Sequence, residues 1–511
     1  MGVEGHDGRL PRADASAMAD ERKCLADLAR KIGSLAESPS VADRLDVKLA
    51  RAEIIMAQAA LDRRPRFRNP AWYSGEAAFG IIGLLLPQSM PVAAESLKAR
   101  LELIPDFLAA GRASLPDAAP RGWVERAKRE TLAFAAFLEG DVRLHPRWRD
   151  EWLQPAEAAA RALEEFAGAL ANMPDTSPAC GEAYLDMLMR DVHGLGLGPH
   201  EGLRLAESAF DELTQELDRM AAGIDPSRSW RQQLDDLATI CPTREGVLAS
   251  YRHWQGRAVE LGQTLVSPAM DYDLDYRALD PAFRKIAKAL YFLSYRSPPA
   301  MHAGTGSVYW VATPAADAAV DLSAHNTALV KSVHAAHHGS IGHHTQNARA
   351  RASPSRLARI GGTDCASGIA LLSGGTMVEG WACHAAELLL EAPGYYSPAE
   401  ALMLKHMERR NAASAILDIR LHLGQWSLDE AKRFYREKAG FAPARIEAEV
   451  TRNSMFPASR LMYWFGVRAI RSLRKAWSGG TRAFHDALIG FGHVPVAFAR
   501  DEMARAGRVG R

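Results

Sequence analysis

Apolar residues recur at the alternating three- and four-residue interval of an α-helix along almost the whole chain. After Gly198-Pro199 they form one continuous stripe, made of Leu203, Ala206, Phe210, Leu213, Leu217 and Met220. Such spacing places the stripe on one helix face, which packs against a core. The pattern therefore predicts a long amphipathic helix that starts after this Gly-Pro pair.

Helix start signals predict two further helices in the last quarter of the chain. The SPAE segment, 397–400, offers a capping serine, a proline for the first turn and a glutamate that closes a capping box. This helix is expected to run to Leu423. Ser427 and Glu430 repeat the capping box before a helix that is expected to end at Gly440.

Strand signals are scarce, and the best is SVYWVAT, residues 307–313. It is β-branched and aromatic, and glycines and Pro314 bound it. The predicted fold class is therefore mainly α, a multi-helical fold with one small β element near 307–313.

The length of 511 residues exceeds the size at which one hydrophobic core usually stops growing. The polar ANMPDTSPAC segment offers the best place to divide the chain. We therefore predict three parts, which are a disordered tail over residues 1–18, an amino-terminal helical subdomain over 19–175, and a second helical domain over 176–505 that carries the chemistry.

Charge gives no reason to expect a nucleic acid or an anionic membrane as the main partner, because 62 basic side chains balance 61 acidic ones. No apolar run reaches the roughly 18 to 20 residues that span a bilayer. A small-molecule or peptide-like substrate is the expected partner, and the sequence predicts no particular oligomeric state.

Cysteine usage and the amino terminus favour a cytoplasmic location. The cysteines are odd in number, widely spaced and free of CxxC pairs: Cys24, Cys180, Cys241, Cys365 and Cys383. This pattern fits neither a disulfide framework nor a thiolate zinc site. The first residues are polar and lack the apolar core of a secretory signal.

The candidate chemistry lies in VHAAHHGSIGHHTQN, residues 333–347. Five of the 17 histidines of the chain fall within eleven positions here, namely His334, His337, His338, His343 and His344. Imidazoles one helical turn apart converge on a single ion, so the cluster favours a divalent-metal site over incidental surface histidines.

The two glycines of this stretch suggest how its histidines meet. His337 and His343 are six residues apart, which places them on nearly opposite faces of a straight helix. A bulge of two residues between them would restore the equivalent of an i, i+4 pair. Gly339 and Gly342 are the residues that tolerate such a distortion.

Four blocks resemble, in the same order, those of the bacterial domain-of-unknown-function family 885, relatives of the gluzincin metallopeptidases. HHGSIGHHTQ (337–346) is similar to H-E-x-x-P-G-H-H-x-Q, and EGWACHAAELL (379–389) to E-G-W-A-x-Y-x-E. LDIRLHLGQWSLDEA (417–431) and EVTRNSMFPASRLMYWFG (449–466) resemble the two later blocks. The resemblance covers about 185–475 and implies a gluzincin-like metallopeptidase fold.

The resemblance also implies a ligand set, in which His337, His343 and Glu379 hold zinc while the glutamate of the first motif deprotonates the zinc-bound water. In this chain His338 stands where that glutamate belongs. A histidine there is either a general base, with an ordinary pKa of about 6.5, or an additional ligand together with His334.

Other departures lie close to the same blocks. Ile341 replaces the motif proline, His384 replaces the tyrosine of the second block, and Ala386 replaces its trailing acid, with Glu387 one place later. The PGQ of the last block is PAS. Substitutions gathered around one site indicate altered chemistry.

Five further residues complete the expected site. Asp418 and His422 are four apart, so the carboxylate can fix the imidazole tautomer. The resemblance implies that Tyr463 stabilises an oxyanion, and we expect His422 to share that role. Arg452 and Arg460 are expected to bind a substrate carboxylate. The alternatives are a surface hydrogen-bonded pair, a core aromatic and surface salt bridges.

These features favour a metal-dependent, hydrolase-like enzyme with an altered catalytic base, acting on an amide, peptide-like or carboxylate-bearing small molecule. Zinc is the expected cofactor. Two histidines and a glutamate also form the facial triad of non-haem iron enzymes, so an iron-dependent oxygenase or lyase is the alternative. A catalytically inactive binding protein is the third possibility.

Overall fold

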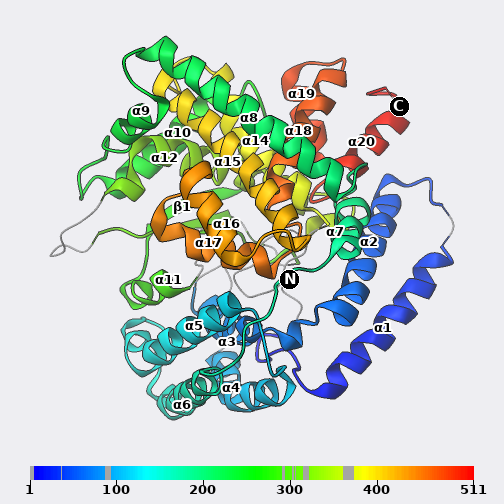
Figure 1. Ribbon diagram of the computed structural model, residues 1–511, viewed down its shortest axis with the longest axis vertical. Helices are drawn as coiled ribbons and strands as arrows, with labels where there is room; N and C mark the ends of the chain where they lie inside the picture. Colours follow the sequence, from blue (N-terminus) through cyan, green and yellow to red (C-terminus); the bar gives the residue numbers. More distant parts are fainter. Residues whose placement is uncertain are drawn as a thin grey trace.

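The computed structural model describes residues 5–35, 37–86, 94–290, 294–301, 304, 306–314, 322–360 and 373–510. Over these residues the protein is mainly helical (Figure 1), as the apolar pattern predicted. The first four residues of the predicted tail and Cys365 lie outside the described residues.

The amino-terminal elements form a helical hairpin followed by a bundle. Two long helices lie side by side along one edge of the molecule (Figure 1), α1 (Ala15–Gly33) and α2 (Val41–Arg63). The bundle packs around buried aromatic rings that include Trp72, Tyr73 and Phe134. Its helices are α3 (Pro70–Leu85), α4 (Ala94–Ser114), α5 (Arg121–Glu139) and α6 (Leu153–Ala169).

Helix α2 also binds the larger, second part of the chain. Arg44 forms a buried ion pair with Glu502, and the carboxylate of Asp46 accepts the backbone N–H of Leu357 at 2.9 Å. The hairpin thus contacts elements from the far end of the sequence. The boundary near residue 175 stays a prediction.

Four long helices form the centre of this second part. Helix α15 (Pro398–His422) packs along α8 (Pro199–Ile224), and α18 (Leu461–Ala476) packs along α14 (Gly375–Leu388). The predicted stripe of α8 is confirmed in its buried positions. Where α14 and α18 cross, a Cβ on Gly380 would collide with the backbone of Gly466, so both glycines permit the close approach.

The remaining described helices are α7 (Glu182–Met187), α9 (Trp230–Leu237), α10 (Val247–Gly262), α11 (Ile286–Ala289), α12 (Thr327–Leu329), α13 (His343–Arg351), α16 (Leu428–Phe434), α17 (Pro443–Met455), α19 (Thr481–Gly490) and α20 (Val496–Arg505). Of these, α11 packs against α5 of the amino-terminal bundle. Three π-helical segments continue helices: Leu188–Val192, Val330–His337 and Tyr435–Ala439. Short 3₁₀ turns are Arg66–Arg68, Asp141–Leu144, Asp150–Trp152, Pro281–Phe283, Ser323–His325, Leu357–Arg359 and Leu389–Glu391.

Both predicted capping boxes are confirmed. Ser397 and Glu400 bond reciprocally at the start of α15, and Ser427 and Glu430 do so at the start of α16. The helix that begins with α16 ends in the π-helical segment before Gly440, which adopts a left-handed conformation with a φ of 78°.

The sheet has three strands in the order β1-β3-β2, with β1 (Asp273–Ala278) parallel and β2 (Tyr295–Arg296) antiparallel to β3 (Gly306–Val311). Strand β3 confirms the predicted element. The sequence analysis missed β1, a short strand DLDYRA in which charged and apolar residues alternate and only Tyr276 is buried. Tyr276 and Tyr309 pack with Val330, the first residue of the π-helical segment that leads to the histidines.

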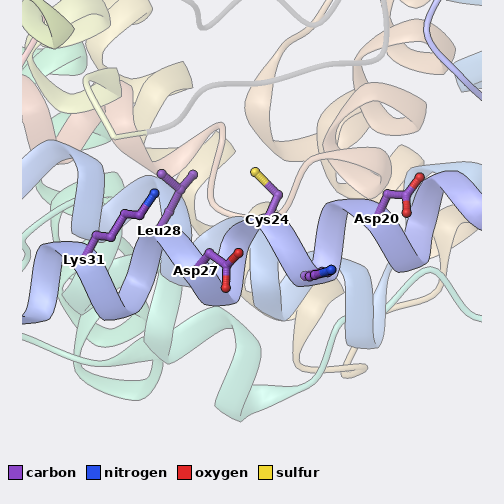
Figure 2. A pocket seen from close by; sticks show the side chains of 6 residues that line it. Asp20, Cys24, Asp27, Leu28 and Lys31 are labelled. Carbon is purple, nitrogen blue, oxygen red and sulfur yellow. The ribbon is translucent and has the colours of Figure 1, made fainter.

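Two surface properties bear on the predictions about partners. Among the described helices, none combines the length and the apolar character that crossing a bilayer requires. A surface depression follows α1 (Figure 2), lined by Asp20, Lys23, Cys24, Asp27, Leu28 and Lys31. Because one exposed helix supplies its whole lining, we do not treat it as a functional site.

Cys24, Cys180, Cys241 and Cys383 are free thiols.

Candidate metal centre

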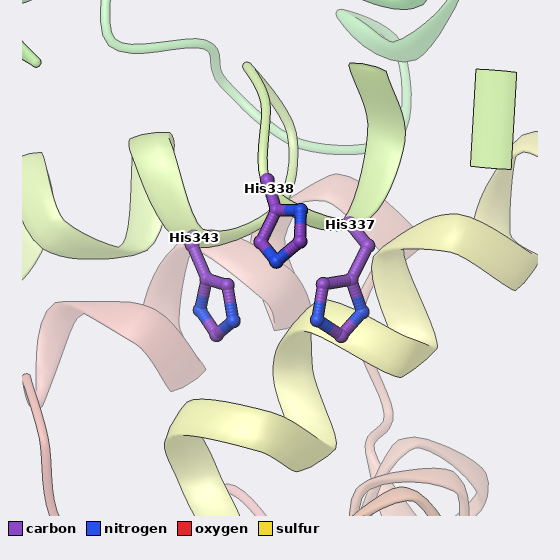
Figure 3. A group of neighbouring side chains, drawn as sticks. All are labelled: His337, His338 and His343. Atoms are coloured by element: carbon purple, nitrogen blue, oxygen red, sulfur yellow. The ribbon is translucent and has the colours of Figure 1, made fainter. Parts of the chain in front are cut away.

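Three histidines converge where a helix is interrupted. The π-helical segment ends at His337, the chain turns through residues 338–342, and α13 begins at His343. Figure 3 shows the rings of His337, His338 and His343 turned toward a common space. One ligand nitrogen from each of the three lies within 4.8 Å of the others.

The glycines of this turn are required by close backbone approach. A Cβ at Gly339 would overlap the carbonyl oxygen of Ala335, and one at Gly342 would overlap that of His337. The chain therefore leaves the helix and starts a new one at His343, rather than bulging by two residues as predicted. The outcome for the two histidines is the same, because both rings reach one side of the break.

Glu379 of α14 supplies the fourth group. Its Oε2 lies 3.7 Å from Nε2 of His337 and 3.6 Å from Nε2 of His343. These separations exceed hydrogen-bond length. They are close to the ~3.3 Å between ligand atoms that tetrahedral zinc would impose with bonds of about 2.0 Å. The donor set and its spacing thus fit a divalent ion, and the side chains of His337 and His343 keep 12% and 11% exposure for access.

Two residues hold the ligands in place, and the sequence analysis assigned neither of them a role. Nδ1 of His343 donates to Oε1 of Gln346 at 3.2 Å, and Nε2 of Gln346 donates to the carbonyl of Met377 in α14 at 2.9 Å. Nε1 of Trp381 donates to the carbonyl of Ile341 in the turn at 3.0 Å. A hydrogen bond at the far nitrogen fixes the tautomer and direction of a ligand histidine. The sequence signal for these two roles was position: Gln346 follows His343 by three residues, and Trp381 follows Glu379 by two.

The electrostatic state of Glu379, His337 and His338 suits metal binding. Burial raises the pKa of Glu379, but contact with His343 and the charges of His337 and Arg452 lower it to about 2. Burial, reinforced by His343, lowers the pKa of His337 to about 3, and burial also lowers that of His338 well below its usual range. At neutral pH the carboxylate is charged and these imidazoles are neutral, which is the form that binds a cation.

The other two histidines of the stretch make different contacts. Nδ1 of His334 is hydrogen-bonded to the hydroxyl of Tyr309, and its ring stacks on Tyr251 at 4.9 Å between centroids. Nε2 of His344 donates to the carbonyl of Tyr272 at 2.6 Å. In the described part of the chain, the metal-ligating cluster contains neither of them.

Arg452 lies in α17, Arg460 directly before α18, and Tyr463 in α18, the helix that packs against α14. Arg452 is buried, and its charge contributes to the low pKa of Glu379. Arg460 is buried and donates from Nε to Oδ1 of Asn453 at 2.8 Å and from Nη1 to the hydroxyl of Tyr463 at 3.3 Å. Their substrate-binding and oxyanion roles stay predictions.

Asp418 and His422 form a fully buried pair, with Oδ1 3.6 Å from Nε2. Nε2 of His422 donates to the carbonyl of Asn453 at 2.9 Å, and Asp418 accepts backbone N–H groups at the start of α18. None of the contacts recorded for His422 among the described residues joins it to the three histidines. Its predicted catalytic role therefore stays a prediction.

The fold and the site define a mainly helical protein with a candidate metal centre of histidines and one glutamate at a helix break. The chain belongs to a family of bacterial proteins of unknown function, DUF885, whose sequence model matches residues 1–503. The family resemblance is thereby confirmed, and the relation to gluzincins stays a prediction. No curated protein matches the chain.

Two solved structures share this fold. A candidate lipoprotein of unknown function from Shewanella oneidensis aligns with a TM-score of 0.76 at 20% identity, over 98% of this chain and 95% of its own. A candidate lipoprotein from Colwellia psychrerythraea aligns with a TM-score of 0.75 at 14% identity, over 98% and 92%. These identities show the fold alone. The cytoplasmic location of this chain stays a prediction, which cell fractionation checks.

Proposed function

We propose that the protein is a divalent-metal-dependent, hydrolase-like enzyme that acts on an amide, peptide-like or carboxylate-bearing small molecule. The observation that carries the proposal is the position of Oε2 of Glu379, which lies 3.7 Å from Nε2 of His337 and 3.6 Å from Nε2 of His343. Three protein ligands leave a coordination position open. Zinc held there would supply a Lewis acid that polarises a carbonyl group and activates water.

The residues of the chain would bind and orient the substrate around that ion. Glu379 balances part of the charge of the ion, and Gln346 keeps His343 directed at it. Arg452, whose charge acts on Glu379, is the proposed partner of a substrate carboxylate. Arg460 donates to the hydroxyl of Tyr463 and so fixes the phenol, which we propose as the group that stabilises developing negative charge.

His338 stands where the resemblance to the family motif implies a glutamate. Its ligand nitrogen belongs to the same cluster as those of His337 and His343. A cation in that space would oppose protonation of a neighbouring imidazole. The position of His338 therefore favours a role as metal ligand over a role as general base. Both roles belong to the proposal.

The place of His338 supports a second candidate function. Three histidines and a glutamate would close the coordination of a tetrahedral zinc ion. An octahedral ion such as iron would keep two positions open with the same four ligands. A non-hydrolytic enzyme of the non-haem iron oxygenase or lyase type is therefore the alternative.

The first experiment measures the metal content of protein purified without chelator or added metal. We expect about one equivalent of a divalent metal in the wild type, and none in the His337→Ala, His343→Ala double variant. His200→Ala, which removes an exposed histidine, is the matched control and should keep the metal. Zinc would support hydrolysis, and iron with oxygen uptake would support the alternative. Metal-free wild type would leave a binding protein and overturn both.

A second variant tests the altered base. His338→Glu restores the glutamate of the family motif, and a positioned carboxylate base contributes about 10²- to 10⁴-fold in rate. With zinc bound, hydrolysis of an amide or ester library should therefore rise by about a hundredfold. An unchanged rate with intact metal content would contradict hydrolytic chemistry at this site.

A further inference from the structure

We propose that Lys331 is a positioning residue for the metal centre. Its buried ammonium group holds the π-helical segment Val330–His337 in the register that presents His337 to the ion. The inference rests on the proposed function and deepens it, because it adds a residue that acts through a proposed ligand. The sequence analysis gave this lysine no role.

The segment that carries His337 has an unusual backbone. Hydrogen bonds of a π-helix span five residues instead of four, as does the bond at its end from the N–H of His338 to the carbonyl of Val333 at 2.9 Å. The wider turns rotate His337 away from the direction that a continuous α-helix would give it. Such turns are rare and occur frequently at functional sites. A π-helical segment of eight residues therefore indicates that contacts from outside stabilise it.

Lys331 makes an enclosed contact of this kind. The side chain is buried, and its Nζ lies 2.5 Å from Oε2 of Glu400 in the first turn of α15. The same ammonium group lies 4.4 Å from the ring centroid of Trp254, and 5.3 Å and 5.4 Å from those of Tyr395 and Tyr396. Aromatic rings attract a cation at such distances. One carboxylate and three rings therefore hold the charge of Lys331.

The groups that hold Lys331 are themselves fixed. Oε2 of Glu400 also accepts the backbone N–H of Ser397 at 2.8 Å, as part of the capping box of α15. The hydroxyl of Tyr395 donates to the backbone carbonyl of Lys331 at 3.1 Å. Lys331 is thus bonded through both its side chain and its backbone. The π-helical segment cannot rotate about its axis without breaking one of these bonds.

Helix α10 connects this contact to the turn that follows the segment. Trp254, whose ring faces the ammonium group of Lys331, is followed by Gln255. Oε1 of Gln255 accepts the backbone N–H of Ser340 in the turn at 3.1 Å. Neighbouring residues of one helix therefore bind the chain on both sides of His337, at Lys331 before it and at Ser340 after it.

Stability alone does not account for the pair of Lys331 and Glu400. Both charges lose their hydration on burial, and replacing such a pair with uncharged groups of similar volume is often neutral or stabilising. An ion pair at hydrogen-bond distance does, however, allow only one arrangement of the two elements that it joins. Setting a register is the best-attested use of a buried polar pair. We therefore assign that use to Lys331.

The test loads the full-length protein with cobalt(II) after EDTA treatment, because the visible absorption of cobalt reports its coordination geometry. The double variant Lys331→Met, Glu400→Gln removes both charges at similar volume, and a glutamine still completes the capping box. We expect an altered cobalt spectrum and, by chelator competition, a metal affinity at least about tenfold weaker. The matched control, Arg126→Met with Glu130→Gln, removes a buried ion pair from α5 of the amino-terminal bundle and should keep both. The urea midpoint in EDTA should fall no further in the test variant than in the control.

Tyr395→Phe guards against a folding defect, because it deletes only the hydroxyl bonded to the carbonyl of Lys331. It should change the cobalt spectrum in the same direction, by less. A wild-type spectrum and affinity in the folded variants would overturn the role of Lys331 and leave a metal-containing protein as an enzyme candidate. Equal losses in the control variant would overturn it as well. A wild type that binds neither zinc nor cobalt would refute the proposed function and the positioning role together.

Discussion

The protein contains two buried histidine–carboxylate pairs in which the carboxylate oxygen lies at the same distance from the imidazole nitrogen. At the metal centre, Oε2 of Glu379 lies 3.6 Å from Nε2 of His343. In α15, Oδ1 of Asp418 lies 3.6 Å from Nε2 of His422. Each pair joins a carboxylate to an imidazole at the same separation, but the two pairs have different surroundings. These surroundings distinguish a candidate reactive site from an architectural one.

The hydrogen-bonding capacity of the second pair is used by the backbone. Asp418 accepts the N–H groups of Ala458, Arg460 and Leu461 at 2.8 to 3.1 Å, and His422 donates to the carbonyl of Asn453. Together they hold the connection between α17 and α18, where Ala458 has a φ of 64°.

The first pair instead directs its polar atoms into a shared space. Two Nε2 atoms face one carboxylate oxygen, and a third imidazole joins them. Burial raises the pKa of Asp418 to about 7, whereas that of Glu379 falls to about 2 because of its basic neighbours. A histidine and a carboxylate in contact therefore indicate chemistry only when the backbone does not already use them.

The largest expected difference concerns metal affinity. Glu379→Gln should reduce divalent-metal affinity about a thousandfold, or ~4 kcal/mol, because it removes the charged ligand. The isosteric change should leave the free energy of unfolding in EDTA within about 1 kcal/mol of the wild-type value. Competition titration with a chromophoric chelator measures the affinity. Unchanged affinity would show that Glu379 is not a ligand.

The converse substitution should affect the fold alone. Asp418→Asn presents an amide N–H₂ to backbone N–H donors that need an acceptor, so the free energy of unfolding should fall by about 3 kcal/mol. Urea denaturation in EDTA measures the loss, and metal affinity of the folded variant should equal that of the wild type. A parallel fall in metal affinity would erase the distinction between the two pairs.

Acid should reveal the structural histidine. Burial, with Arg64 acting in the same sense, lowers the pKa of His422 from 6.5 to about 3 in the folded protein. Between these values the unfolded chain binds a proton that the folded chain does not, so stability falls as pH falls below 6.5. From pH 7.5 to 5, the wild type should lose about 2 kcal/mol more than His422→Gln. Urea midpoints at both pH values provide the comparison, and equal losses would contradict a neutral, buried His422.

The smallest expected effect comes from the residue that orients a ligand. Gln346→Met removes the acceptor for Nδ1 of His343 at similar volume, so metal affinity should fall about tenfold. Gln263→Met, at an exposed position after α10, controls for the loss of an amide. The chelator titration used for Glu379→Gln measures both. An effect as large as that of Glu379→Gln would mean that Gln346 itself binds the metal.

Local signals explain which elements the sequence predicted well. The capping boxes placed the starts of α15 and α16, and the apolar stripe placed α8, because these patterns act within a few residues. Strand β1 was not predicted because it is short, half of its residues are charged, and its pairing with β3 joins residues more than thirty positions apart. The glycines indicated a distortion between His337 and His343, but not the complete turn that the structure shows.

The sequence by itself determined the helical class, the capped helices, the family and the gathering of histidines around two glycines, because each depends on local spacing or on order along the chain. Tertiary structure decided which polar groups meet. It brought Glu379 to the histidines, assigned His334 and His344 to tyrosine contacts, and engaged Asp418 with a distant backbone. These outcomes depend on helix packing, which brings together residues far apart in sequence, and no local pattern encodes that.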